Sequence, residues 1–181
     1  MNEAATDERL WEKIRRVRLL MLDVDGVLTD GRIIVDDAGL ESKHFDVRDG
    51  HGLKLLMRYD IGVAIVTGRR SRVVEHRAAD LEIAEVHQGV WHKQEVLAGI
   101  LEQRKLAAEE TAYIGDDIVD IPLMRRVGFA VAVASAVPEV IGAADYVTRC
   151  PGGRGAVREV CELILKAKGL WAEVAARYEF S

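Results

Sequence analysis

Short apolar segments alternate with longer amphipathic segments along most of this 181-residue chain. The apolar segments are only a few residues long and end in polar or glycine-containing turns, which is typical of strands that are buried on both faces. The longer segments carry apolar residues at helical spacing. Strands that alternate with helices predict an α/β fold, with a Rossmann-like, doubly wound parallel sheet that has helices on both faces.

The predicted elements follow one another without an internal repeat or a low-complexity linker. Strands are predicted at 18–24, 61–66, 85–87, 111–114, 129–133 and 145–148. Helices are predicted at 50–59, 71–80, 93–105, 118–126, 138–142, 156–168 and 170–178. Strands at 32–35 and 41–47, joined by a turn at 36–39, predict a β-hairpin. We expect one domain over 1–181, with a hairpin flap at about 31–47 and a helical tail at about 156–181.

The composition narrows the class of protein. Hydrophobic residues make up 49% and charged residues 30%, as in ordinary globular proteins. The net charge of −5 argues against nucleic acid as a partner. The segment from Asn2 to Arg9 lacks the apolar core of a signal peptide, and the apolar run near Leu19 is too short to span a membrane. Cys150 and Cys161 suit neither a disulfide framework nor a zinc site, so we expect a cytoplasmic protein without membrane contact.

Polar side chains come at, or just after, the ends of three predicted strands. Asp23 lies at the end of the strand at 18–24 and Asp25 directly after it, Thr67 follows the strand at 61–66, and Asp116 follows the strand at 111–114. In open parallel sheets, ligands bind at the carboxyl ends of the strands. The sequence therefore predicts that these side chains meet at one rim of the sheet.

Asp23 and Asp25 have a spacing that suits phosphoryl chemistry. On a strand, residues two apart place both side chains on one face. Two adjacent carboxylates repel each other unless a cation or a shared proton intervenes, and Mg²⁺ prefers oxygen ligands. One carboxylate can attack phosphorus to form an aspartyl-phosphate, while the other protonates the leaving alcohol and later deprotonates water. A simple turn is the alternative, because Asp and Gly are common turn formers.

Thr67 and Lys93 each have a functional and a structural interpretation. The Thr67 hydroxyl and the backbone beside Gly68 can hold a phosphate oxygen at a helix start, or Thr67 can be a plain helix cap. Lys93 can act as a point charge beside a phosphate, or it can lie on a solvated helix face.

The run Gly115-Asp116-Asp117-Ile118-Val119-Asp120 combines three acids with a strand end. Asp116 is expected to bind the metal directly, Asp117 to act through water or by orientation, and Asp120 to act from the helix behind. The alternative is an acidic helix N-terminus, which the helix dipole favours.

The order Asp-x-Asp, Thr, Lys and Gly-Asp-Asp-x-x-Asp resembles the phosphatases of the haloacid dehalogenase superfamily over nearly the whole chain. This resemblance implies that Asp23 is the nucleophile, that Asp25 is the acid/base, and that Thr67 and Lys93 hold the phosphate and balance its charge. Magnesium would be held by Asp23, the backbone carbonyl of Asp25, and Asp116.

The spacing of these motifs leaves no room for the cap domain that many such relatives carry. Between Asp25 and Thr67 the chain has only the predicted hairpin and one helix, and the segment from Thr67 to Lys93 is shorter still. A capless enzyme has to close its site in another way, and we expect it to do so by oligomerising.

Several longer segments closely resemble the family of 3-deoxy-D-manno-octulosonate 8-phosphate phosphatases of lipopolysaccharide precursor synthesis. They are DVDGVLTDG at 23–31, KHFDVRDGHG at 43–52, VTGRRS at 66–71, QGVWHK at 88–93, YIGDDIVD at 113–120 and PGGRGAVREV at 151–160. That family is capless and magnesium-dependent. It is tetrameric, and neighbouring subunits complete each site. The resemblance implies a homotetramer with shared active sites and a phosphorylated sugar acid as substrate.

The resemblance also implies which residues bind this substrate. The substrate has a carboxylate, and an arginine guanidinium suits it because it can bind a carboxylate bidentately. Arg69 and Arg77 match family positions suited to that role, with Gly68 beside Arg69. Arg48 and Asp49, at the end of the hairpin, are expected to come from a neighbouring subunit.

Three other functions remain open. A nine-carbon sugar-acid phosphatase of the same capless group is one; in such relatives an acidic residue can occupy the position of Arg69. The second is a promiscuous phosphate scavenger. The third is a non-catalytic oligomeric binding module, and the intact motifs disfavour this third function. After Gly169 the chain continues as LWAEVAARYEFS, a predicted extra helix. Such a helix would limit any docking of the tail in a neighbouring site.

Overall fold

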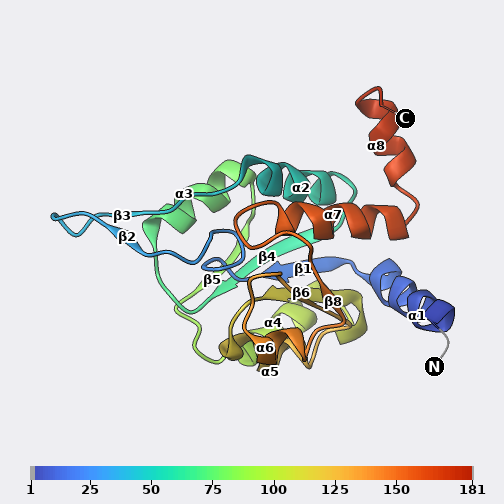
Figure 1. Cartoon of the computed structure of the whole chain (residues 1–181), viewed down its shortest axis with the longest axis horizontal. Helices are drawn as coiled ribbons and strands as arrows, with labels where there is room; N and C mark the ends of the chain where they lie inside the picture. The colour runs from blue at the N-terminus through green and yellow to red at the C-terminus, as the bar shows by residue number, and fades with distance from the viewer. Residues whose placement is uncertain (1–2, 181) are drawn as a thin grey trace.

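A computed structural model describes residues 3–180 and has a parallel sheet at its centre (Figure 1). Six strands pair in the order β5-β4-β1-β6-β7-β8, and every recorded pairing is parallel. The strands are β1 Leu19–Leu22, β4 Gly62–Thr67, β5 Glu85–Gln88, β6 Thr111–Gly115, β7 Phe129–Ala132 and β8 Tyr146–Val147. All residues of β1, β6 and β7 are buried, which explains their nearly continuous apolar sequences.

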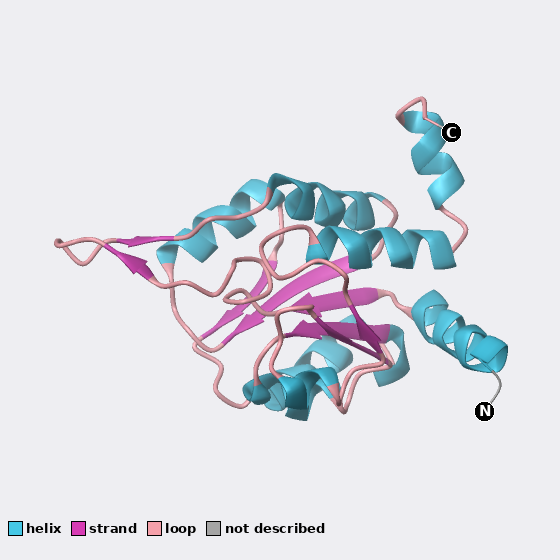
Figure 2. Cartoon of the chain, in the orientation of Figure 1, coloured by secondary structure: helices cyan, strands magenta, loops and turns pink. Residues whose placement is uncertain are grey.

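Helices cover both faces of this sheet (Figure 2). One face carries α2 Val47–Arg58, α3 Arg72–Leu81 and α7 Ala156–Ala167, and the other carries α4 Lys93–Arg104, α5 Ile121–Met124 and α6 Pro138–Ile141. Two short 3₁₀ helices, η1 Ala108–Glu110 and η2 Ile118–Asp120, flank β6. The predicted doubly wound α/β fold is confirmed. In contrast to the single helix expected at 118–126, η2 and α5 are separate helices.

A terminal helix lies at each end of the chain. The first, α1 Glu3–Arg16, was not predicted; it packs beside α7 and buries Ile14. The last, α8 Trp171–Arg177, confirms the extra helix that the sequence predicted. Val174 of α8 is buried, and the hydroxyl of Tyr178 accepts a hydrogen bond from Arg58 in α2 at 3.0 Å.

The hairpin forms its own two-stranded sheet and projects from the body, at the left of Figure 1. Strand β2 Ile34–Val35 pairs antiparallel with β3 Glu41–Ser42, so both strands are shorter than predicted. The second strand ends at Ser42, and it could not reach residue 47 as predicted because Asp46 caps α2, where its carboxylate accepts the amide of Arg48 at 2.7 Å. The single-domain boundaries over 1–181 stay a prediction.

Within residues 3–180, each helix is either too short or too polar to cross a membrane.

Candidate active site

Residues from three strands converge at the carboxyl edge of the sheet. In the register of the sheet, Leu22 at the end of β1 pairs with Ile65 of β4 and Ile114 of β6. Asp23 therefore follows β1 at the level where Thr67 ends β4 and Asp116 follows β6. The predicted common rim is confirmed for these strand ends.

A buried lysine organises the centre of this rim. The Nζ of Lys93 donates to Asp23 Oδ2 at 2.6 Å, to Asp120 Oδ1 at 2.6 Å and to the hydroxyl of Tyr113 at 3.0 Å. Tyr113 in turn donates to Asp120 Oδ1 at 2.6 Å. We call these four residues the core cluster. All four are buried, so the position of Asp23 is fixed by charged hydrogen bonds within the protein interior.

Burial and charge act against each other in the core cluster. Burial would lower the pKa of Lys93, but the charges of Asp23 and Asp120 outweigh it, so that pKa is raised and the ammonium stays charged. Burial raises the pKa of Asp23, against the opposing charge of Lys93. The backbone amide of Val24 also donates to Asp23 Oδ1, at 2.6 Å.

Asp116 completes a group of carboxylates that suits a divalent cation. Carboxylate oxygens of Asp23, Asp116 and Asp120 all lie within 4.8 Å of one another. Burial, together with the charges of Asp120 and Asp23, raises the pKa of Asp116 to about 7. A bound cation would relieve this repulsion, and oxygen ligands are those that Mg²⁺ prefers. The residues present therefore fit a divalent metal.

Asp120 and Asp117 are already engaged by their own surroundings. Asp120 holds Lys93 through Oδ1, and its Oδ2 accepts the backbone amides of Asp116 and Asp117 at 2.9 and 3.2 Å. Asp117 is exposed and caps η2 through the amide of Ile118 at 2.7 Å. Each oxygen of Asp120 thus accepts two hydrogen bonds, whereas each oxygen of Asp23 accepts one, so Asp23 and Asp116 are the members of the group best able to hold a metal.

A second set of charges surrounds Asp25. The Nζ of Lys43 lies 2.5 Å from Asp25 Oδ1 and 3.2 Å from Glu41 Oε1. Arg69 donates to Glu41 Oε1 at 2.9 Å and has Nη1 at 3.8 Å from Asp25 Oδ2, and the hydroxyl of Ser71 donates to Glu41 Oε2. We call Asp25, Glu41, Lys43, Arg69 and Ser71 the hairpin cluster, because Glu41 and Lys43 come from the second arm of the hairpin.

The sequence expectation that Asp23 and Asp25 share one face of a strand is wrong. Strand β1 ends at Leu22, and both aspartates lie in the turn that follows it. The two carboxylates are consequently held by different lysines, Asp23 by Lys93 and Asp25 by Lys43.

Glycines let backbone and carboxylate approach closely at this turn. Gly26 has φ +86°, and a Cβ there would lie 1.9 Å from Asp116 Oδ2. A Cβ on Gly152, from the loop before α7, would lie 1.7 Å from the carbonyl oxygen of Gly26. The amide of Gly153 donates to the carbonyl of Val27 at 2.9 Å. The loop before α7 is therefore packed directly on the turn that carries Asp23 and Asp25.

Comparison with known proteins agrees with this geometry. A family model described as haloacid dehalogenase-like hydrolase matches residues 79–159. The 3-deoxy-D-manno-octulosonate 8-phosphate phosphatase of Escherichia coli K12 is 52% identical over 87% of this chain and 84% of its own length. The chain belongs to the family of 3-deoxy-D-manno-octulosonate 8-phosphate phosphatases. The family that the motifs predicted is thus confirmed.

Solved structures of family members have the same fold. The crystal structure of the Yersinia pestis phosphatase has a TM-score of 0.90 and 46% identity, and the match covers 91% of this chain and 89% of that one. The phosphatase of Moraxella catarrhalis, solved in complex with magnesium, phosphate and KDO, has a TM-score of 0.91 and 40% identity, with 93% and 98% covered.

The other residues that the sequence predicted for substrate binding have varied positions. Gly68 follows β4 and lies between Thr67 and Arg69 at the rim. Thr67 is buried, and its carbonyl accepts the amide of Val90 at 3.0 Å, which fixes the loop leading to Lys93. Arg77 pairs with Asp80 of the same helix at 2.6 Å, and its guanidinium lies over the ring of Phe45, 5.6 Å from the ring centroid.

Asp49 has a structural position that the sequence did not predict. Its carboxylate is buried and accepts the amides of Arg158 and Gly155 at 2.7 and 3.3 Å, so it caps the start of α7. Burial raises the pKa of Asp49 to about 6. Within this subunit the side chain ties α2 to α7. The predicted contribution of Asp49 to a neighbouring site stays a prediction.

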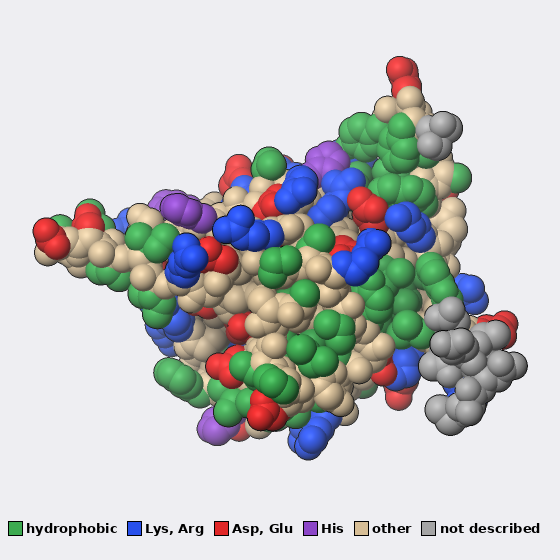
Figure 3. Space-filling view, in the orientation of Figure 1, with side chains coloured by type: hydrophobic (Ala, Val, Ile, Leu, Met, Phe, Trp, Pro, Cys, Tyr) green, Lys and Arg blue, Asp and Glu red, His purple; other side chains and the backbone are tan. Residues whose placement is uncertain are grey.

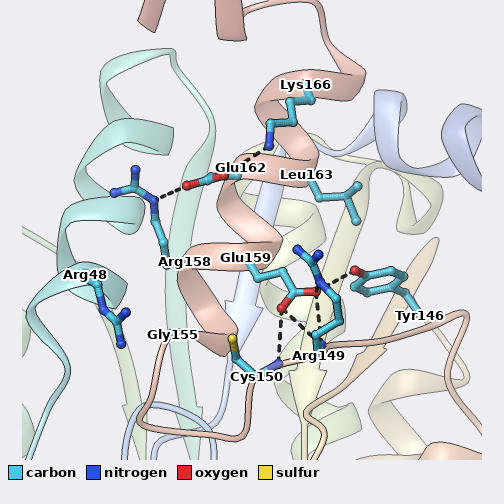
Figure 4. Close-up of a pocket in the computed structure, with 10 residues that line it drawn as sticks. All are labelled: Arg48, Tyr146, Arg149, Cys150, Gly155, Arg158, Glu159, Glu162, Leu163 and Lys166. Carbon is cyan, nitrogen blue, oxygen red and sulfur yellow. Dashed lines mark hydrogen bonds and ion pairs between the residues drawn. The ribbon is translucent and has the colours of Figure 1, made fainter. Parts of the chain in front are cut away.

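Arg48 lies at the edge of a hollow of about 410 Å³ beside α7 (Figure 4). All four cations that line this hollow are paired: Arg149 with Glu159, Arg158 and Lys166 with Glu162, and Arg48 with Asp46 outside it. The predicted contribution of Arg48 to a neighbouring site stays a prediction.

Sequence reasoning gave no role to Glu41, Lys43, Ser71 or Tyr113. Lys43 and Tyr113 lie inside segments that carried the family resemblance, and Ser71 ends a third. The family resemblance of these segments was therefore the signal that could have identified the three residues. Glu41 had none, because an acid in a predicted hairpin strand is ordinarily a solvated residue.

Proposed function

We propose that this protein is a magnesium-dependent phosphatase that hydrolyses 3-deoxy-D-manno-octulosonate 8-phosphate to the free sugar acid and phosphate, in lipopolysaccharide precursor synthesis. The observation that carries this proposal is the Asp23 carboxylate, held at 2.6 Å by the buried Lys93 and grouped with Asp116. The similarity to a family member solved with magnesium, phosphate and KDO supports the same substrate class.

The nucleophile in this proposal is Asp23. One of its carboxylate oxygens attacks phosphorus, the bond from phosphorus to the sugar oxygen breaks, and an aspartyl-phosphate forms. Magnesium, held by Asp23, Asp116 and the carbonyl of Asp25, supplies positive charge to the phosphoryl oxygens when it is bound. Lys93 and the amide of Val24 hold the attacking carboxylate in position, and the hydroxyl of Thr67 with the backbone at Gly68 binds a phosphate oxygen.

Asp25 acts as general acid and then as general base. Its proton goes to the sugar oxygen as that oxygen leaves. The resulting carboxylate then takes a proton from water, which attacks the phosphorus of the aspartyl-phosphate and releases inorganic phosphate. Asp23 and protonated Asp25 are thereby regenerated. Asp117 and Asp120 support this site from the segment after β6, and Arg69 binds the carboxylate of the sugar.

The proposal includes a cytoplasmic homotetramer with shared active sites, to which Arg48 and Arg77 contribute substrate contacts. Figure 3 shows hydrophobic side chains along the projecting hairpin, where Ile33, Val35 and Leu40 are 62%, 54% and 67% exposed. These exposed apolar side chains support an assembly that covers them. The net charge of −5 supports a small-molecule substrate and no nucleic-acid partner.

A substrate panel on the purified protein tests the reaction. We expect magnesium-dependent phosphate release from the eight-carbon ester and a lower kcat/KM on nine-carbon sugar-acid phosphates. Asp23→Asn should reduce kcat by about 10⁴-fold or more, because the amide cannot form the aspartyl-phosphate. Activity that survives this change would end the nucleophile assignment, and equal or better turnover of the nine-carbon ester would change the substrate.

Light scattering on the same samples tests the assembly. A tetramer is expected, and a monomer would favour an open, promiscuous phosphatase.

A further inference from the structure

The guanidinium of Arg69, which is proposed to bind the substrate carboxylate, is already bound to the carboxylate of Glu41. Arg69 Nη2 donates to Glu41 Oε1 at 2.9 Å, and Ser71 Oγ donates to Glu41 Oε2. The Nζ of Lys43 lies 3.2 Å from Oε1. Both oxygens of Glu41 are therefore bound, by donors from the hairpin and from the segment that follows β4.

The donors around Glu41 form a site with capacity for a further oxygen. The side chain of Lys43 is 1% exposed, and Ser71 is 7% exposed. Arg69 Nη1 is buried and has no hydrogen-bond partner within the described residues. A buried donor without a partner is costly, so an additional acceptor at Nη1 would be favourable. Burial would raise the pKa of Glu41, but the bonds from Ser71 and Lys43 outweigh it and lower that pKa, so Glu41 is present as an anion.

Glu41 sits on an element that has few ties to the domain. Strands β2 and β3 pair with each other and with no strand of the central sheet. In the part of the chain that the structure describes, the hydrogen bonds and ion pairs from residues 33–44 to the central domain come from Glu41 and Lys43. A displacement of the hairpin would therefore withdraw Glu41 without breaking the sheet.

We propose that Glu41 fills, in the free protein, the place that the substrate carboxylate takes at Arg69, and that Ser71 and Lys43 hold Glu41 there as an internal competitor. The carboxylate of the sugar acid displaces Glu41, so one anion replaces another and the charge of the site is preserved. A phosphate ester without a carboxylate leaves Glu41 in place. This inference rests on the proposed function and names the residues that select an acidic sugar.

Glu41→Gln provides the test, because it keeps the shape of the side chain and removes the competing charge. The KM for 3-deoxy-D-manno-octulosonate 8-phosphate should fall about three- to tenfold, since the apparent affinity rises with the binding-competent fraction of the free enzyme. The KM for glucose 6-phosphate, which has no carboxylate, should not change. Glu41→Ala should give the same selective fall and serves if the Gln variant does not fold.

Two controls isolate the effect. Asp37→Asn removes one charge from the exposed turn of the same hairpin and should leave both KM values unchanged. In an Arg69→Ala background, Glu41→Gln should produce no further fall in KM.

The inference is overturned if Glu41→Gln changes both KM values equally, or if the KM for the sugar acid ester stays the same or rises. Turnover of glucose 6-phosphate by the unsubstituted protein, with none of the sugar acid ester, would instead contradict the proposed function.

Discussion

Lys93 and Lys43 each hold one aspartate of the turn after β1, but in very different surroundings. Lys93 lies at the start of α4, and the side chains of its partners Asp23 and Asp120 are 10% and 0% exposed. Lys43 lies in the second arm of a projecting hairpin, and its partners Asp25 and Glu41 are 20% and 18% exposed. The proposed nucleophile, Asp23, is thus held by a buried lysine of the central domain, whereas the proposed acid/base, Asp25, is held by a lysine of the projecting hairpin.

The largest effect is expected from Lys93→Met. This change leaves Asp23 and Asp120 buried without their counter-charge, so the free energy of unfolding should fall by about 3–5 kcal/mol. The kcat should fall by about 10³-fold, because the nucleophile loses the donor that orients it. Urea unfolding and steady-state kinetics measure the two effects.

Lys43→Met is the matched change in the hairpin cluster. Because Asp25 and Glu41 reach water, the free energy of unfolding should change by about 1 kcal/mol or less. The kcat should still fall by about 10- to 100-fold, since Asp25 loses a partner that orients it. A loss of stability equal to that of Lys93→Met would break the comparison between the two clusters.

Magnesium binding should depend on pH through Asp116. Its pKa of about 7 means that the metal must displace a proton at lower pH, so the affinity should fall about tenfold for each pH unit below 7 and level off above it. Because this folded-state pKa lies above the ordinary aspartate value of 3.8, the metal-free protein should also lose stability as the pH rises toward 7. Calorimetry with magnesium at several pH values measures the affinity, and Asp116→Asn should abolish its pH dependence.

Tyr113→Phe should have the smallest effect. It removes one hydroxyl that bridges Lys93 and Asp120 but leaves their ion pair intact. We expect a loss of about 1 kcal/mol in the free energy of unfolding and a decrease of about threefold in kcat. A decrease as large as that of Lys93→Met would mean that the hydroxyl, and not the ammonium, organises the core cluster.

Positions at strand ends could be predicted because they depend on topology alone. Asp23, Thr67 and Asp116 each come where a buried apolar run stops, and parallel strands bring such places to one edge. Lys93 could be assigned only through its order among the motifs, since nothing local distinguishes it from a solvated lysine. The length of β1 was overestimated by including Asp23, and that error produced the wrong prediction that both aspartates share one face.

Contacts between distant polar residues could not be predicted. The carboxylate of Asp49 reaches an amide 109 residues away, at Arg158, and no periodicity indicates such a pairing. Glu41 and Lys43 look like surface residues of a hairpin until the fold places Arg69 and Asp25 beside them. The helix α1 was missed because tertiary packing against α7, rather than a local signal, buries its apolar face.

The close approach of Gly152 to Gly26 has a consequence for the making of the enzyme. A growing chain on the ribosome acquires Asp23, Thr67, Lys93 and Asp116 well before the loop that braces the turn after β1. This loop is synthesised just before α7, near the end of the chain. In the proposed mechanism, the nascent chain therefore carries Asp23, Thr67, Lys93 and Asp116 before it can complete the active site, so we expect catalysis to need the last sixth of the polypeptide.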